Sequence, residues 1–441
     1  MKPFLKKTLS EYGMSLVLLL LCAYFSVVTW SDQSPAGADG AQQVTEAIAR
    51  LGGTPRVLIA ATSQPDDAAF TARLLTDLPV NGAVVVATAS GEPQAAREAL
   101  QKLAASGGKL DVIACTQAAG GWLVFSDIKT DYPGLGSPQI ITPRSYRWPN
   151  FLKTANLLNI ANQIAIIAII AIGMTMVIIT GGIDLSVGSL LALSAVLVAR
   201  FIRDYAGGAA ASTGGLVLAS LAAVVICGGA GAFSGLMITR FRIPPFIVTL
   251  AMMLVGSGLA YTLAAGQTIY QIPESFIWLG RGADLFSVPN AVVLMFILYP
   301  LAHVLMSRMK LGRYLYAVGG NSEAARLSGV PVRRVLLFAY TASALLAGLG
   351  GVIMASQLKS GSGNYGNMYE LYVIAAVVVG GTSLSGGEGK MPGTLIGAFT
   401  IAVIQNGMNL TNVESYTQKV VLGLVILGAV LLDRLRHQAR P

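Results

Sequence analysis

Apolar segments long enough to cross a lipid bilayer follow one another through most of this chain. A transmembrane helix needs about 20 mostly apolar residues. After one segment near the N-terminus, we expect spans at 160–180, 185–203, 215–239, 245–265, 289–307, 334–356, 370–380, 393–411 and 418–433. Only 12% of the residues are charged, against roughly 25% in soluble domains. The sequence therefore predicts an α-helical polytopic membrane protein with about ten transmembrane helices, several of them short or broken by glycine.

The first apolar segment, SLVLLLLCAYFSVVTW, follows the basic stretch MKPFLKK. No small-x-small cleavage site ends the segment, so a membrane span is favoured over a cleaved signal peptide. We expect residues 1–30 to form the cytoplasmic N-terminus and the first transmembrane helix.

Basic residues set the expected orientation, because cytoplasmic loops carry an excess of lysine and arginine. With the N-terminus inside, four basic clusters fall on the cytoplasmic side, whereas Arg200 and Arg203 fall outside as exceptions. The clusters are Arg240/Arg242, Arg308/Lys310/Arg313, Arg333/Arg334 and Arg434/Arg436/Arg440. The net charge of +9 is thereby explained without a nucleic-acid partner, and residues 434–441 are expected to be a cytoplasmic tail.

Residues 31–145 differ from the rest of the chain. Segments 56–62, 82–88 and 110–115 have the pattern of buried strands, and 66–75 and 92–106 that of helices. Alternating strands and helices indicate a small parallel α/β domain, βαβαβ-like. Its eight basic and eleven acidic residues contrast with the positive remainder of the chain. We therefore expect an extracytoplasmic domain inserted after the first helix, with 146–433 as the transmembrane domain.

Cysteines offer no metal site or disulfide framework. Cys22, Cys115 and Cys227 share no short spacing, and Cys115 is the only cysteine within 31–145. No metal and no cofactor are expected.

The stretch TGGIDLSVGSLLALSA (180–195) places Asp184 between two apolar segments. An acidic side chain at membrane depth costs a few kcal/mol. Glycines such as Gly182 precede it and Ser186 follows, which indicates a broken helix. Two interpretations are equally favoured: a substrate or gate element, or a cytoplasmic turn in which Asp184 caps the next helix.

The polar segment 312–335 lies between two expected spans on the inner side. Within it, NSEAARLSG can form one short helix, capped by Asn321 or Ser322 and ended by Gly329. Such a helix could dock into a groove of a partner. Spacing alone favours a solvated loop.

The stretch GGTSLSGGEGK (380–390) contains two signals that suggest ATP binding, LSGGE and glycines leading to Lys390. A phosphate loop requires Ser or Thr after the lysine, and Met391 follows instead. We interpret the glycines as a second helix break, which echoes 181–188.

Four blocks together carry a family resemblance: GMTMVIITGGIDLSVGSLLALSA, ITRFRIPPFIVTLAMM, GGNSEAARLSGVPV and YELYVIAAVVVGGTSLSGGEGKMPGTLIGA. In this order they resemble the permease subunits of bacterial ABC importers for monosaccharides of the ribose, xylose, arabinose and galactose types. The resemblance covers roughly residues 150–433 and most of the first span.

The resemblance implies a transport subunit rather than an enzyme, in the bacterial inner (plasma) membrane, with no catalytic residues of its own. Its expected partners are a separate ABC ATPase subunit inside, a periplasmic sugar-binding protein outside, a second copy or related permease, and membrane lipid. The loop 312–333 is expected to couple to the ATPase through Asn321, Ser322, Glu323, Ala324, Ala325, Arg326, Leu327 and Gly329. The translocation path is expected to involve Gly182, Asp184, Ser186, Glu370 and Ser383.

The chain departs from the family pattern in two places. Tyr372 stands where such permeases usually have an acidic residue, and the 31–145 domain is an insertion. The insertion could dock the binding protein, sense a ligand or be passive, since a fold alone does not give a function. Two other functions stay open: an ion-coupled secondary transporter with Asp184 and Glu370 as coupling acids, or a membrane receptor whose outer domain senses a ligand.

Overall fold

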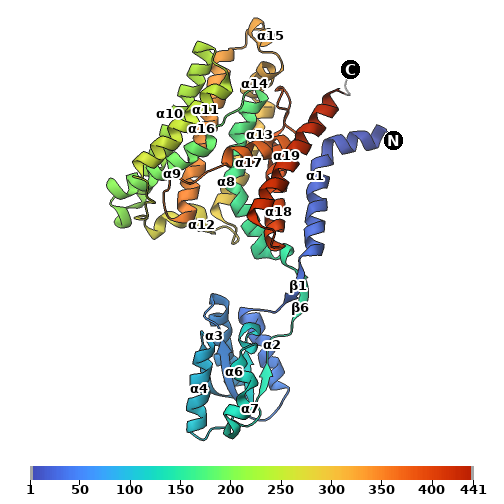
Figure 1. Cartoon of the computed structure of the whole chain (residues 1–441), viewed down its shortest axis with the longest axis vertical. Coiled ribbons are helices and arrows are strands. Elements are labelled where there is room, and N and C mark those ends of the chain that lie inside the picture. Colours follow the sequence, from blue (N-terminus) through green and yellow to red (C-terminus); the bar gives the residue numbers. More distant parts are fainter. Residues whose placement is uncertain (1–2, 439–441) are drawn as a thin grey trace. The chain divides into compact units, whose positions relative to one another are not determined.

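The computed structural model describes residues 3–438, and side chains from 13 to 431. The chain divides into two compact units (Figure 1). Unit 1 comprises the chain up to Thr29 and from Asn150 onward, and unit 2 runs from Trp30 to Pro149. The side chains of the predicted tail 434–441 lie outside the described residues.

Unit 1 is helical. Its helices are α1 (Pro3–Val28), α8 (Thr154–Ile179), α9 (Val187–Asp204), α10 (Thr213–Phe241), α11 (Pro245–Leu263), α12 (Trp278–Arg281), α13 (Asn290–Arg308), α14 (Lys310–Gly320), α15 (Ser322–Leu327), α16 (Val332–Leu358), α17 (Tyr369–Val379), α18 (Met391–Leu410) and α19 (Ser415–Gln438). Short 3-10 turns occur at Asn150–Leu152, Gly208–Ala210 and Glu274–Ile277.

Five of the described helices are long and apolar enough to cross a membrane: α8, α10, α11, α13 and α16. Three shorter apolar segments lie at Gly13–Val28, Tyr369–Val379 and Ser415–Leu431. The apolar window of α8 is 89% buried inside unit 1, so α8 is its central helix. Helices of this number and hydropathy make unit 1 a polytopic membrane protein.

Small residues allow the helices of unit 1 to approach closely. Gly173 of α8 lies against Ser343 of α16, and a Cβ at Gly231 of α10 would overlap Ala344 and the Tyr340 carbonyl. Close backbone approach at small residues is a common mode of helix packing in membranes.

Helix α17 is only 11 residues long because the chain first returns along α9. After α16 and its C-cap residue Lys359 (φ 52°), Gly361 contacts Ala195, and Gly366 contacts Gly188. Helix α17 then begins beside the first turn of α9, so part of the depth of unit 1 is crossed by non-helical chain that consists mostly of turns.

Unit 2 is built on a four-stranded parallel sheet in the order β3-β2-β4-β5. Its strands are β2 (Arg56–Ala61), β3 (Val84–Ser90), β4 (Val112–Cys115) and β5 (Gln139–Ile141). Strand β2 alternates between two cores: Val57 and Ile59 face one, Leu58 and Ala60 the other. Both faces are covered by helices, as a parallel sheet requires. The helices are α2 (Gly37–Ala49), α3 (Pro65–Val80), α4 (Pro93–Ala105), α5 (Gln117–Gly120), α6 (Leu123–Ser126) and α7 (Ile128–Asp131).

The three segments expected as strands correspond to β2, β3 and β4, and the two expected helices to α3 and α4. Unit 2 is longer than the predicted 31–145 because β1 (Trp30–Gln33) pairs antiparallel with β6 (Tyr146–Pro149). This ribbon brings the two ends of unit 2 together.

Candidate functional site

Helix α15 forms the short element expected from NSEAARLSG. The Asn321 side chain accepts hydrogen bonds from the amides of Glu323 (3.1 Å) and Ala324 (2.9 Å), so Asn321, and not Ser322, is the cap. Gly329 follows the helix with a φ of 83°, a left-handed conformation that glycine adopts without steric cost.

The exposed face of α15 combines charge and an apolar tip. Glu323 and Arg326 form an ion pair on the helix surface, and the Arg326 guanidinium lowers the pKa of the Glu323 carboxyl. Leu327 is 75% exposed, whereas Ala325 is buried against the rest of unit 1. An exposed leucine beside two charges suits a helix that docks into a groove.

The two helix breaks, 180–186 and 380–390, meet beside α14. The Gly387 amide donates to the Ile179 carbonyl (2.8 Å), and the Tyr316 hydroxyl of α14 donates to the Gly389 carbonyl (2.7 Å). Gly319 of α14 packs directly against Ile179 and Gly387. We call these contacts the glycine junction. It holds both breaks against the helix that leads into α15, and it occupies the stretch whose glycines suggested a phosphate loop.

Asp184 is held inside the first break. Its carboxylate accepts from the Ser186 amide (3.0 Å), the Ser186 hydroxyl (2.6 Å) and the Ser343 hydroxyl of α16 (2.9 Å). The side chain is 2% exposed, and Gly182 lies against the Tyr340 hydroxyl. Asp184 thus joins the start of α9 to α16.

The other two residues expected on the path lie on α17 and in the second break. Glu370, in the first turn of α17, is half-buried against Gly188. Ser383 is buried in the second break, where its hydroxyl accepts from the Ser385 amide (3.3 Å). Gly182, Asp184 and Ser186 therefore lie together in the first break, whereas Glu370 lies beside the first turn of α9 and Ser383 in the second break.

A cavity of about 220 Å³ opens between α8, α16, α17 and α18. Its polar lining consists of Gln163, Gln357, Gln405, Tyr369 and Tyr372. The remaining lining is apolar, as in most small-molecule pockets. We call it the amide cavity.

Comparison with known proteins places unit 1 in a family. Residues 156–430 match the family model described as the permease component of the branched-chain amino acid transport system. The match covers more than half of the chain. The chain belongs to this permease family.

The relatives of this permease are sugar transporters. It is 45% identical to the ribose import permease protein RbsC of Bacillus subtilis over 288 residues, which cover 65% of this chain and 87% of that protein. It is 43% identical to RbsC of Escherichia coli K12 over 290 residues, with the same coverage. It is 35% identical to the L-arabinose permease AraH of Escherichia coli K12 over 292 residues, which cover 66% of this chain and 86% of AraH. No solved structure matches the chain.

These relatives identify the permease as a transmembrane component of a monosaccharide ABC importer in the inner membrane. Membership of the family implies an ATPase and a periplasmic binding protein as partners. The relatives are transport proteins, not enzymes. Unit 2 lies outside the residues matched by the family model.

The residues that line the amide cavity were not predicted from the sequence. Only Tyr372 was singled out, and for a different reason. A usable signal was present, because Gln163 and Gln405 lie at the ends of the apolar stretches of α8 and α18, beside Asn162 and Asn406. Their spacing along the chain, however, gives no indication that they converge.

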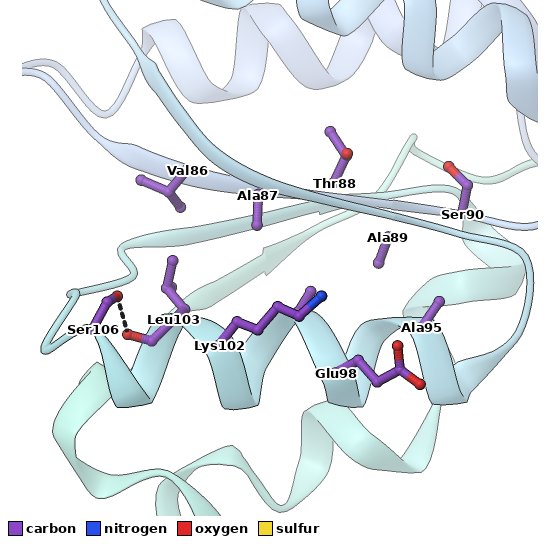
Figure 2. A pocket seen from close by; sticks show the side chains of 11 residues that line it. Val86, Ala87, Thr88, Ala89, Ser90, Ala95, Glu98, Lys102, Leu103 and Ser106 are labelled. Atoms are coloured by element: carbon purple, nitrogen blue, oxygen red, sulfur yellow. Dashed lines mark hydrogen bonds between the residues drawn. The ribbon is translucent and has the colours of Figure 1, made fainter.

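A second hollow of the permease, of about 520 Å³, lies in unit 2 between the edge strand β3 and α4 (Figure 2). Small side chains such as Ala87, Ala95 and Ala99 line it, and Glu98 and Lys102 stand on its helical side. The groove follows from small side chains at the exposed edge of the sheet. Within the described part of the chain, no group of three His, Cys, Asp or Glu side chains is placed to hold a metal ion.

Proposed function

We propose that this permease carries ribose or a related monosaccharide through unit 1, driven by an ATPase that docks on α15. The observation that carries the proposal is the connection of α15, through α14 and the glycine junction, to both helix breaks. A displacement of α15 therefore acts on α9, α17 and α18 together. The choice of ribose rests on the ribose permeases at 45% and 43% identity.

The proposed topology has ten spans: α1, α8, α9, α10, α11, α13, α16, α17, α18 and α19. Counting from a cytoplasmic N-terminus puts the segments 180–186, 309–331 and 380–390 on the inner side. The glycine junction supports this, because all three segments contribute to it. The count places unit 2 outside the cell membrane and the C-terminus in the cytoplasm.

The translocation path is proposed to be completed by a second permease, either another copy or a related chain, in contact with membrane lipid. The region of Gly182, Asp184 and Ser186 would then act as a hinge beside the path. Glu370 would lie beside the path in the first turn of the short helix α17, and Ser383 in the break that follows this helix. ATP hydrolysis would take place on the partner ATPase.

The Glu323→Lys variant tests the docking of α15. We expect it to abolish uptake and binding-protein-stimulated ATP hydrolysis in a complex reconstituted with its ATPase and binding protein, because the exposed charge facing the partner is reversed. Uptake of D-ribose and hydrolysis are measured together.

The matched control exchanges the two charges, as Glu323→Arg with Arg326→Glu, which keeps an ion pair within α15. If α15 docks through these charges, the exchanged variant also fails although its helix is intact. Wild-type uptake by Glu323→Lys would contradict the assignment of α15.

A further inference from the structure

We propose that the amide cavity is a binding site for one monosaccharide within the permease, so that the transported sugar is held inside unit 1 and not only by the binding protein. This inference rests on the proposed function. It names the side chains that would recognise the sugar: the three glutamines by hydrogen bonds to hydroxyl groups, and the two tyrosines by contact with the ring.

Three amide side chains from three different helices converge on the cavity. Gln163 lies on α8, Gln357 on the last turn of α16, and Gln405 on α18. Polar side chains within membrane helices are costly and face a partner or a water-filled cavity. Their convergence on one hollow indicates that the hollow is used by a polar molecule.

The hydrogen bonds of these amides leave capacity for a ligand. Gln163 is exposed, and its amide nitrogen donates to the Asn159 side chain (3.3 Å). The Gln357 amide donates to the Asn162 side chain (3.2 Å), which fixes its orientation, while its carbonyl oxygen accepts no bond from the described residues. Gln405 makes no hydrogen bond to any described residue. A half-buried amide without partners is unfavourable, and a sugar hydroxyl can both donate to it and accept from it.

The tyrosines complete the lining. Tyr369 and Tyr372, one turn apart on α17, stand edge to face with ring centroids 6.4 Å apart. An aromatic side chain offers an apolar face to a ring and a hydroxyl at its end. This combination fits a sugar, which carries C–H faces and hydroxyl edges. None of the five polar side chains is charged, so the cavity suits a neutral ligand.

The size of the cavity limits the ligand. Pockets for drug-sized molecules have about 300–1,000 Å³, whereas this cavity has about 220 Å³. A single monosaccharide ring therefore fits better than an oligosaccharide.

Ligand protection of an introduced thiol tests the site directly. In the complete transporter, Gln405→Cys is labelled with a small water-soluble methanethiosulfonate reagent with and without saturating D-ribose, in a Cys22→Ser background. Cys115 and Cys227 are buried. We expect ribose to slow labelling at least several-fold. The matched control is Asn409→Cys on the same helix, outside the cavity lining, where ribose should have no effect.

A second variant, Gln405→Met, keeps the length of the side chain but removes its amide. We expect ribose uptake at limiting sugar to fall about tenfold, which corresponds to one hydrogen bond of about 1.4 kcal/mol. Size-exclusion chromatography with the ATPase checks that the variant still folds and assembles.

The outcomes separate the two proposals. Equal labelling of Gln405→Cys with and without ribose, in a wild-type transporter that imports ribose, overturns the binding site and leaves the function standing. A wild-type transporter that imports no ribose overturns the proposed function, and the sugar site with it.

Discussion

At the scale of single residues, the first helix break depends on the hydrogen bonds that the Asp184 carboxylate accepts. From the sequence, two roles of Asp184 are equally favoured: a residue of the translocation path and a helix cap. In the structure Asp184 bonds to Ser186 at the start of α9 and also reaches Ser343, 159 positions along the chain. The bonds to Ser186 are local, two residues along the chain, and Ser186 is the N-cap residue of α9. The bond to α16 was not foreseeable from the sequence, since no local pattern marks Ser343.

The Ser343→Ala variant should destabilise the permease by about 1.5–3 kcal/mol, because a hydrogen bond to a charged group is lost. The matched control is Tyr340→Phe on the same helix. The buried Tyr340 hydroxyl has no hydrogen-bond partner among the described residues, so its removal should be neutral or slightly stabilising. Unfolding in mild detergent measures both variants, and equal losses of stability would contradict this account of Asp184.

At the scale of elements, the glycine junction explains why the two GG-containing breaks resemble one another. Each ends one helix and turns the chain back into unit 1, and each needs glycine where the backbone adopts positive φ, as at Gly181 (79°) and Gly387 (76°). The sequence predicted both breaks. That they hydrogen-bond to each other and rest on α14 was decided by helix packing.

The Gly319→Ala variant should disrupt the junction, because the added methyl group would overlap the Ile179 carbonyl and lie 2.6 Å from the Gly387 amide nitrogen. We expect a loss of about 1–3 kcal/mol from overpacking and reduced uptake per ATP hydrolysed. Gly320→Ala is the control: its neighbouring position meets no atom within 4 Å, and alanine is favoured over glycine in helices. Similar uptake by the two variants would argue against the junction as the link from α15.

At the scale of the whole molecule, unit 2 separates two parts of unit 1 along the chain, and its two ends meet in the β1–β6 ribbon. Within unit 1, the Asn150 amide donates to the Thr29 carbonyl (2.8 Å), and the Phe151 amide donates to the Thr29 hydroxyl (3.1 Å). Phe25 and Phe151 stack with centroids 6.1 Å apart. Unit 1 therefore closes on itself at this point, independently of unit 2.

Replacing Trp30–Pro149 with a two-residue turn should leave a permease that folds and assembles with its ATPase, because the contacts between Thr29, Asn150 and Phe151 are kept. Size-exclusion chromatography and ATP hydrolysis measure assembly. Uptake of ribose then shows whether unit 2 is needed to receive the sugar. An aggregated or ATPase-free deletion variant would show that unit 2 is required for the fold of unit 1.

The sequence alone determined the membrane class and, through four blocks of residues, the family, and it narrowed the α15 cap to Asn321 or Ser322. These properties depend on hydropathy, on local capping chemistry or on motifs that lie close together along the chain. The tertiary structure decided which distant residues meet: Asp184 with Ser343, Gly319 with Gly387, and three glutamines around one cavity. Helix packing sets these contacts, because small residues in several helices allow the backbones to approach, and no single segment encodes that geometry.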